Sequence, residues 1–391
     1  MSDTGTHEAL QHASPGGGES PSPASASALA VLLVLAVVSP WAFGSAPFWV
    51  RKGLNLVALA TSLLVLVAKW RAGLAPLPPR LLWPLFGLVA LGAFQLVPLP
   101  PSLHFLLASG SAEIWHPREP AAAAVIGHGA RPISVLPAAT VGATVWVLGL
   151  LSLVALATPA LASRRVRRGA LAILTAGGLA VGVYGVVARV AFGSLLFGRF
   201  PVPTASPFGP FVSKNHFAAY VGMAALLALG LATGLADRER QGSAVLSWTR
   251  SRRAVWVFVT FVVGVTLALT VLASQSRGGA VALTVGLLAF LLLRAPSRRK
   301  GGGRNRWTIA ALTAITLALL AALPPDARSR LTSIFGAPDA SAAYRVSLWS
   351  DALRAWRASP WLGQGLGAFS DILPRYKTSS GELRIEHAEN D

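Results

Sequence analysis

Long apolar runs alternate with short polar segments along most of the chain. A helix of about 20 apolar residues crosses the ~30 Å hydrocarbon core of a bilayer. The pattern therefore predicts an all-α polytopic membrane protein with about nine transmembrane helices. The expected spans are residues 29–49, 53–69, 81–97, 140–161, 170–190, 216–235, 254–273, 279–293 and 307–323.

One apolar stretch is too long for a single span and has an arginine near its middle. Residues 254–293 would extend roughly twice the bilayer thickness at ~1.5 Å per residue. The stretch is therefore expected to fold back on itself, with Ser274–Gly279 as a tight hairpin whose glycines allow the turn. This places Arg277 at the membrane edge and avoids a charged group in the hydrocarbon centre.

Composition supports a membrane protein and suggests three parts. Of the 391 residues 53% are hydrophobic and 13% charged, with a mean hydropathy of +0.58, whereas soluble domains have about 25% charged residues. Residues 1–28, rich in Ser, Pro, Gly and Ala, are predicted to be a disordered tail. A transmembrane domain is expected over 29–323 and an outward-facing region over 324–391. The chain has no cysteine.

Basic residues indicate the orientation. The net charge is +19, but 18 of the 34 basic residues fall in four alternate short loops, which favours a topology signal over a nucleic-acid partner. The positive-inside rule places these loops and the N-terminus in the cytoplasm. The hairpin at Arg277, the loops 98–139 and 191–215 and everything after Pro324 then face outward. The four basic, cytoplasmic loops contain Lys69, Arg71 and Arg80; Arg164, Arg165, Arg167 and Arg168; Arg238, Arg240, Arg250, Arg252 and Arg253; and Arg294, Arg298, Arg299, Lys300, Arg304 and Arg306.

Two outward segments concentrate polar side chains. The loop 191–215 ends in GPFVSKNHFAAY, which places Lys214, Asn215 and His216 at the start of the sixth span. After Pro324, Trp349, Leu353 and Trp356 recur at helical spacing, with Asp351, Arg354 and Arg357 interleaved. A helix with two tryptophans on one side is expected to lie along the membrane interface. It should end before Pro360, and a loop with Gly363, Gly365 and Gly367 should follow, without the strand–helix context of a dinucleotide fingerprint.

These motifs together resemble the O-antigen ligase/polymerase family. The resemblance covers about 205–391 and rests on GPFVSKNHFAAY, SQSRGG, YRVSLWSDALRAWRASPWLGQGLGAF and the terminal HAEND, in the order typical of the family. PLPPSL and PISVLPAATVGATVWVLG resemble the family more weakly. There are two departures: Glu389 stands where the family usually has a second histidine, and the chain stops where family members continue into further spans. The sequence therefore suggests an incomplete enzyme.

The resemblance implies a GT-C-like membrane glycosyltransferase of the bacterial inner membrane, with its active site on the outer face. The donor would be a glycan on undecaprenyl pyrophosphate, and the acceptor a hydroxyl of a lipid or polysaccharide. The implied reaction is inverting and needs no metal or other cofactor. It assigns Arg277 to the donor diphosphate and His387 to deprotonation of the acceptor; Arg345, Lys214, Asn215, His216 and Asn390 would contact substrate.

Other interpretations compete with these roles. Arg277 could only mark a hairpin, Lys214–His216 could only cap a helix, and Arg345 could be a solvated residue at a helix start. His104, His116 and His128 lie outside the motifs and are expected to be loop residues. A transporter or flippase of lipid-linked glycans is the alternative function; it should place charges within spans near the midplane. A membrane scaffold would leave the outward arginines and histidines unexplained.

Overall fold

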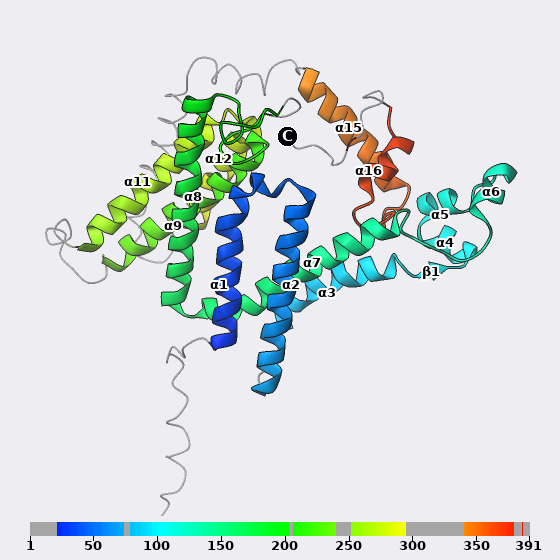
Figure 1. Cartoon of the computed structure of the whole chain (residues 1–391), viewed down its shortest axis with the longest axis horizontal. Helices are drawn as coiled ribbons and strands as arrows, with labels where there is room; N and C mark the ends of the chain where they lie inside the picture. The colour runs from blue at the N-terminus through cyan, green and yellow to red at the C-terminus, as the bar shows by residue number, and fades with distance from the viewer. Residues whose placement is uncertain are drawn as a thin grey trace, which may run out of the picture.

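The structure is a computed structural model that describes residues 22–73, 79–202, 206–239, 252–294, 340–378 and 385. Long helices dominate these residues, as the sequence predicts (Figure 1). They are α1 (Pro23–Val38), α2 (Phe48–Arg71), α3 (Pro79–Phe94), α7 (Pro137–Ala157), α8 (Arg164–Phe192), α9 (Lys214–Glu239), α11 (Arg252–Ala273), α12 (Arg277–Arg294) and α15 (Ala340–Arg357).

Within the part of the chain that the structure describes, six helical segments are long and apolar enough to cross a membrane, which fits an all-α polytopic membrane protein. They comprise α1 extended to Trp41, α2, α7 extended to Ala162, α8, and the apolar parts of α9 and α11. The apolar part of α12 is shorter, and α3 has 16 residues with Pro84 inside it. The expected span 307–323 lies outside the described residues, so the count of nine is not confirmed.

The first two helices meet earlier than the sequence suggested. The first span was expected to continue to residue 49, but α1 ends at Val38 and α2 begins at Phe48. Two short 3-10 turns, η1 (Ser39–Trp41) and η2 (Phe43–Ser45), lie between them. Proline lacks the N–H that continues a helix, and Pro40 sits at the start of η1. Gly44 adopts a φ of +64°, and a Cβ there would meet the ring of Phe211 at 2.5 Å.

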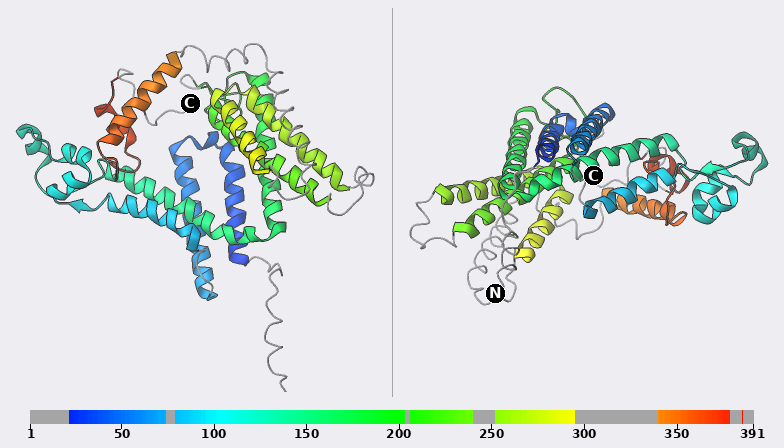
Figure 2. Two further views of the ribbon diagram at one scale, coloured as in Figure 1. Left: turned by 180° about the vertical axis from the view of Figure 1, so that it is seen from behind. Right: turned by 90° about the horizontal axis from the view of Figure 1, so that it is seen from below.

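The largest core forms around α9, which packs against α8, α11 and α12 (Figure 2). Small residues allow the helices to approach closely: a Cβ on Gly178 would lie 2.2 Å from the Cβ of Ala224. Lipid offers no hydrophobic driving force between helices, so such close contacts stabilise a membrane bundle. A second core joins α1, α2 and α7, and the Tyr220 hydroxyl of α9 donates to the Ala36 carbonyl of α1 at 3.0 Å.

The segment between α3 and α7 is more structured than a simple loop. It contains α4 (Pro101–Leu107), α5 (Ser109–Trp115) and α6 (Pro120–Ile126). Two short strands pair antiparallel, β1 (Pro98–Leu99) and β2 (Arg131–Pro132), with Pro98 opposite Pro132. The short helix α16 (Phe369–Ile372) and the turn η4 (Leu373–Arg375) lie with the end of α15 beside this segment (Figure 1).

Candidate functional site

The expected hairpin is present between α11 and α12. The last helical residue of α11 is Ala273, and Arg277 is the first residue of α12. Gln275 turns the chain with a φ of +54°, which is uncommon for a residue other than glycine. Arg277 thus stands at the positive N-terminal end of a helix, and the hairpin removes it from the middle of the apolar stretch.

Two helix N-termini from separate sequence motifs meet at this hairpin. The Ser276 hydroxyl oxygen caps α12 by accepting the Gly279 amide at 3.0 Å, and Ser213 caps α9 by accepting the Asn215 amide at 3.2 Å. The Ser276 hydroxyl also donates to Asn215 Oδ1. The motifs that contain Lys214–His216 and Arg277 are therefore joined by a direct contact, although 61 residues separate its two partners.

A glycine makes this contact possible. A Cβ on Gly279 would lie 2.4 Å from the Cβ of Ala218 on α9, closer than real Cβ contacts. A Cβ on the neighbouring Gly278 would meet nothing within 4 Å. Of the two glycines in SQSRGG, the second is therefore the one that brings α12 against α9.

A pocket of about 450 Å³ opens beside the hairpin. It combines two cationic side chains, Arg189 and Lys214, with hydroxyl and amide groups. The N-terminal end of α9 adds partial positive charge. The pocket can therefore accept an anion. Its lining residues are Arg189, Ser194, Ser206, Pro207, Phe208, Lys214, Ala273, Ser274 and Gln275.

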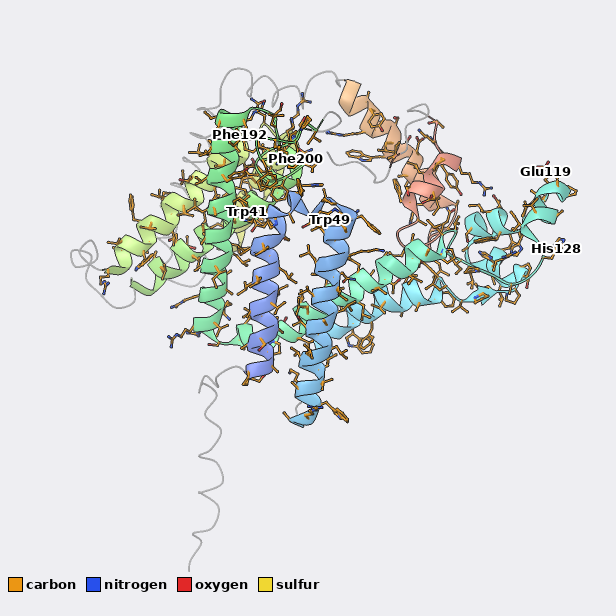
Figure 3. The ribbon with its side chains drawn as sticks, in the orientation of Figure 1. Trp41, Trp49, Glu119, His128, Phe192 and Phe200 are labelled. Carbon is orange, nitrogen blue, oxygen red and sulfur yellow. The ribbon has the colours of Figure 1, made fainter. Side chains whose placement is uncertain are left out.

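Aromatic packing holds the pocket wall. The Lys214 amide donates to the Ser206 carbonyl at 2.8 Å, and the ring of Phe208 packs on Phe217 of α9 at a centroid distance of 4.6 Å. In a separate aromatic group, the ring centroid of Phe43 lies 5.3 and 5.7 Å from those of Phe197 and Phe200. Figure 3 places Phe192 and Phe200 near one another, on the side of the molecule where Trp41 and Trp49 also lie.

Sequence reasoning did not assign Arg189 to the site. It lies in the last turn of α8 and donates to the Gly193 carbonyl at 3.3 Å. The available signal was its position, a cation near the end of an apolar span. Of the predicted residues near the pocket, only Lys214 lines it; Asn215 contacts the hairpin, and His216 is exposed.

The tryptophan stripe of α15 faces away from its packed side. Trp349, Leu353 and Trp356 are exposed, whereas Leu348 is fully buried. Asp351, which the sequence suggested was one of the polar positions interleaved with the stripe, is also fully buried. It accepts the Thr378 amide at 3.2 Å and the Thr378 hydroxyl at 2.9 Å and pairs with Arg354. Sequence periodicity missed this because Thr378 is supplied by a later segment.

The glycine loop after α15 docks against the ends of α3 and α7. Gln95 donates to the Leu362 carbonyl at 2.6 Å and accepts the Leu366 amide at 2.8 Å. The Thr140 hydroxyl donates to the Leu366 carbonyl at 2.9 Å. Gly363, Gly365 and Gly367 have φ values of +66°, +128° and +78°. The motifs PLPPSL, PISVLPAATVG and GQGLGAF thus meet in one structural unit, and the glycines serve its turns.

His104 is not the simple loop residue that the sequence suggested. It is fully buried, and its Nε2 lies 2.8 Å from the Ser111 hydroxyl. Because that hydroxyl donates to the Ala108 carbonyl at 3.1 Å, the Nε2–H of His104 is the donor to Ser111. Burial, and secondarily the nearby His116, lowers the pKa of His104 to about 4. The ring centroids of His104 and His116 lie 5.4 Å apart. His128 is exposed.

The remaining predicted site residues are placed only in part. Arg345 is half-buried on α15, one turn before Leu348. His387 and Asn390 lie outside the described residues. Among the described residues, no group of three or more His, Cys, Asp or Glu side chains could hold a metal ion.

Comparison with known proteins identifies one domain. Residues 262–391 match the family model described as O-antigen ligase. The matched segment includes the hairpin at Arg277, α15 and the glycine loop. No curated protein and no solved structure matches the chain.

Proposed function

Because residues 262–391 carry the domain of the O-antigen ligase family, we propose that the chain is a membrane glycosyltransferase of the bacterial inner membrane. Its donor is a glycan carried on undecaprenyl pyrophosphate. Its acceptor is a hydroxyl group of a lipid or polysaccharide, which attacks the anomeric carbon with inversion. The reaction takes place at the outer face of the membrane, among membrane lipids, with the N-terminus in the cytoplasm.

The observation that carries this proposal is the basic pocket beside the α11–α12 hairpin. Departure of a lipid diphosphate develops negative charge, and charge-assisted hydrogen bonds stabilise that charge. Arg189 and Lys214 line the pocket, and Arg277 begins the helix that follows its wall. A diphosphate bound there would meet Arg189, Lys214 and the N-terminal end of α9, and the motif assigns Arg277 to the same diphosphate.

The acceptor side is assigned by the motifs. His387 is the general base, because a histidine is suited to proton transfer near neutral pH. Arg345 and Asn390 contact the substrate, and Asn215 and His216 form the rim of the donor site. The outward Trp349, Leu353 and Trp356 of α15 rest on the lipid headgroup region, because tryptophan is favoured there.

The position of the charges favours an enzyme over a transporter or flippase. A transporter places charged groups within its spans, near the midplane. Here Arg189 lies in the last turn of α8 and donates to Gly193 just beyond the helix. The family match does not favour the transporter either.

The donor site is tested by replacing its cations in membrane vesicles that contain the full chain. Arg277→Ala is expected to lower glycan transfer by about 10²-fold, the effect of removing one donor to a developing anion. Arg277→Lys should also lose activity, because lysine lacks the bidentate geometry of a guanidinium. Arg189→Ala and Lys214→Ala should follow the same direction.

Arg165→Ala is the matched control, an exposed arginine at the other end of α8. It should insert and transfer at the parental rate. Parental transfer by Arg277→Ala, with insertion unchanged, would contradict the donor-site role.

The base is tested separately. His387→Ala should leave donor binding intact and reduce transfer by roughly 10²–10⁴-fold, the usual contribution of a general base. Glu389→Ala serves as the neighbouring control and should matter less. A His387→Ala variant with full activity and an unchanged pH–rate profile would eliminate this role.

A further inference from the structure

The hydrogen bond between Asn215 and Ser276 joins two cationic motifs at a buried point. Ser276 is 2% exposed, and its hydroxyl has a single proton, which it donates to Asn215 Oδ1. The hydroxyl oxygen also accepts the Gly279 amide at 3.0 Å. The proton of this hydroxyl is therefore committed to a contact within the protein and is not available to a substrate.

The same serine is tied to the wall of the anion pocket. Its amide donates to the Ser274 hydroxyl oxygen at 3.3 Å, and that hydroxyl donates to the Val271 carbonyl of α11 at 2.6 Å. Ser274 lines the pocket, and so does Lys214, the neighbour of Asn215 in sequence. A chain of hydrogen bonds thus extends from α11 through the pocket wall and Ser276 to the first turn of α9.

The sequence positions of the two partners give the contact its consequence. Lys214 directly precedes Asn215, and Arg277 directly follows Ser276. Consecutive Cα atoms are ~3.8 Å apart, so a bond that fixes the two partners also fixes the backbone from which each cation extends. Cations that are already held in place lose less conformational freedom when they bind an anion, and they bind it more tightly for that reason.

We infer that Asn215 and Ser276 are positioning residues, whose hydrogen bond holds the backbone of Arg277 at a set separation from that of Lys214 for the binding of a diphosphate. The inference rests on the proposed function for the identity of the ligand. It gives Asn215 a role through Ser276, in place of direct contact with the ligand. Direct contact would make the effects of the two side chains independent of one another.

A double-mutant cycle with inorganic pyrophosphate tests this coupling. Isothermal titration calorimetry on the purified full chain in detergent gives the Kd without any glycan or acceptor. Asn215→Ala and Ser276→Ala should each raise the Kd about tenfold, within the range for directly bonded pairs. The double variant should raise it no further, because both changes remove the same hydrogen bond. Ser276→Thr keeps the hydroxyl and should recover the parental Kd.

Thr284→Ala is the matched control. It removes a hydroxyl from the same helix, one that donates to the Ala280 carbonyl of that helix at 2.9 Å, and it should leave the Kd unchanged. The thermal unfolding temperature of each variant reports whether the chain is folded.

A second cycle leaves the cap of α12 intact and measures the positioning of the arginine directly. Arg277→Ala should weaken pyrophosphate binding in the parental chain, and it should weaken binding several-fold less in the Asn215→Ala background. The reason is that an arginine whose backbone is no longer held contributes less to the binding of the anion.

Two results would overturn the inference while leaving the donor site in place. One is a pair of effects, from Asn215→Ala and Ser276→Ala, that multiply in the double variant. The other is an unchanged contribution of Arg277 in the Asn215→Ala background. A folded parental chain that does not bind pyrophosphate would remove the proposed donor site, and this inference with it.

Discussion

Two regions of the molecule are stabilised by different kinds of contact. One is the hairpin, where α12 meets α9; the other is the glycine loop, which docks beside α3 and α7. Around the hairpin, close approach of small residues dominates, as at Gly279 against Ala218. Around the glycine loop, buried polar side chains such as Gln95 and Thr140 satisfy backbone groups. The difference follows from the backbone: a helix pairs its own amides and carbonyls, whereas an irregular loop needs partners from elsewhere.

The largest expected effect is loss of Gln95. Gln95→Leu removes the acceptor of the Leu366 amide and the donor to the Leu362 carbonyl. The two hydrogen bonds are partly buried, and an unpaired backbone group there costs up to about 3 kcal/mol, so the docked loop should lose at most roughly 6 kcal/mol of local stability. Hydrogen exchange of peptides from 358–368 measures this.

Phe94→Leu at the neighbouring exposed position is the control and should leave the exchange unchanged. Unaltered protection of 358–368 in Gln95→Leu would show that the loop is held by packing, as the hairpin is.

The next effect depends on pH. The pKa of His104 is lowered to about 4 in the folded protein, against about 6.5 in an unfolded chain. Between these values the unfolded chain binds more protons, so stability is complete above pH 6.5 and falls as the pH decreases toward 4. The full loss amounts to roughly 3 kcal/mol. Hydrogen exchange of 98–116 at pH 7 and pH 5 should reveal it, and the hairpin should not respond.

His104→Gln should remove the pH dependence, and His128→Gln at an exposed position should retain it. A dependence that survives His104→Gln would assign it to another group.

The smallest effect distinguishes two adjacent glycines at the hairpin. Gly279→Ala places a methyl group 2.4 Å from the Cβ of Ala218, and overpacking of this kind costs about 1–3 kcal/mol. The thermal unfolding temperature in detergent should fall, and the Asn215–Ser276 contact should be lost.

Gly278→Ala meets open space and should be neutral or slightly stabilising, because alanine favours a helix over glycine. Equal effects of the two substitutions would contradict close packing as the basis of the hairpin contact.

Much of the fold could be predicted from hydrophobic periodicity. Eight of the nine expected spans contain a helix in the described residues, and the hairpin at Arg277 followed from length and the cost of a buried charge. The end of the first span was wrong, because Pro40 and Gly44 turn an apolar stretch that hydropathy alone extends. The end of α15 at Arg357, before Pro360, is confirmed.

The site was predictable in its parts and not in its assembly. Local motifs pointed to Lys214, Asn215 and Arg277, but the contact between Asn215 and Ser276 joins positions that no periodicity connects. Arg189 was missed as a pocket residue, and the burial of Asp351, a polar position interleaved with the tryptophan stripe, and of His104, an expected loop residue, was not predicted. The sequence around a polar residue does not show whether a distant segment will supply its hydrogen-bond partner.

The sequence by itself determined the membrane class, the helical spans and the motifs of the family, because these depend on composition and on spacing within one segment. Tertiary structure decided which motifs meet: GPFVSKNH with SQSRGG at the hairpin, and PISVLPAATVG with GQGLGAF at the docked loop. It also decided which polar groups are buried, Asp351 and His104 among them. The physical reason is that burial and pairing are properties of two surfaces in contact, and a single segment specifies only one of them.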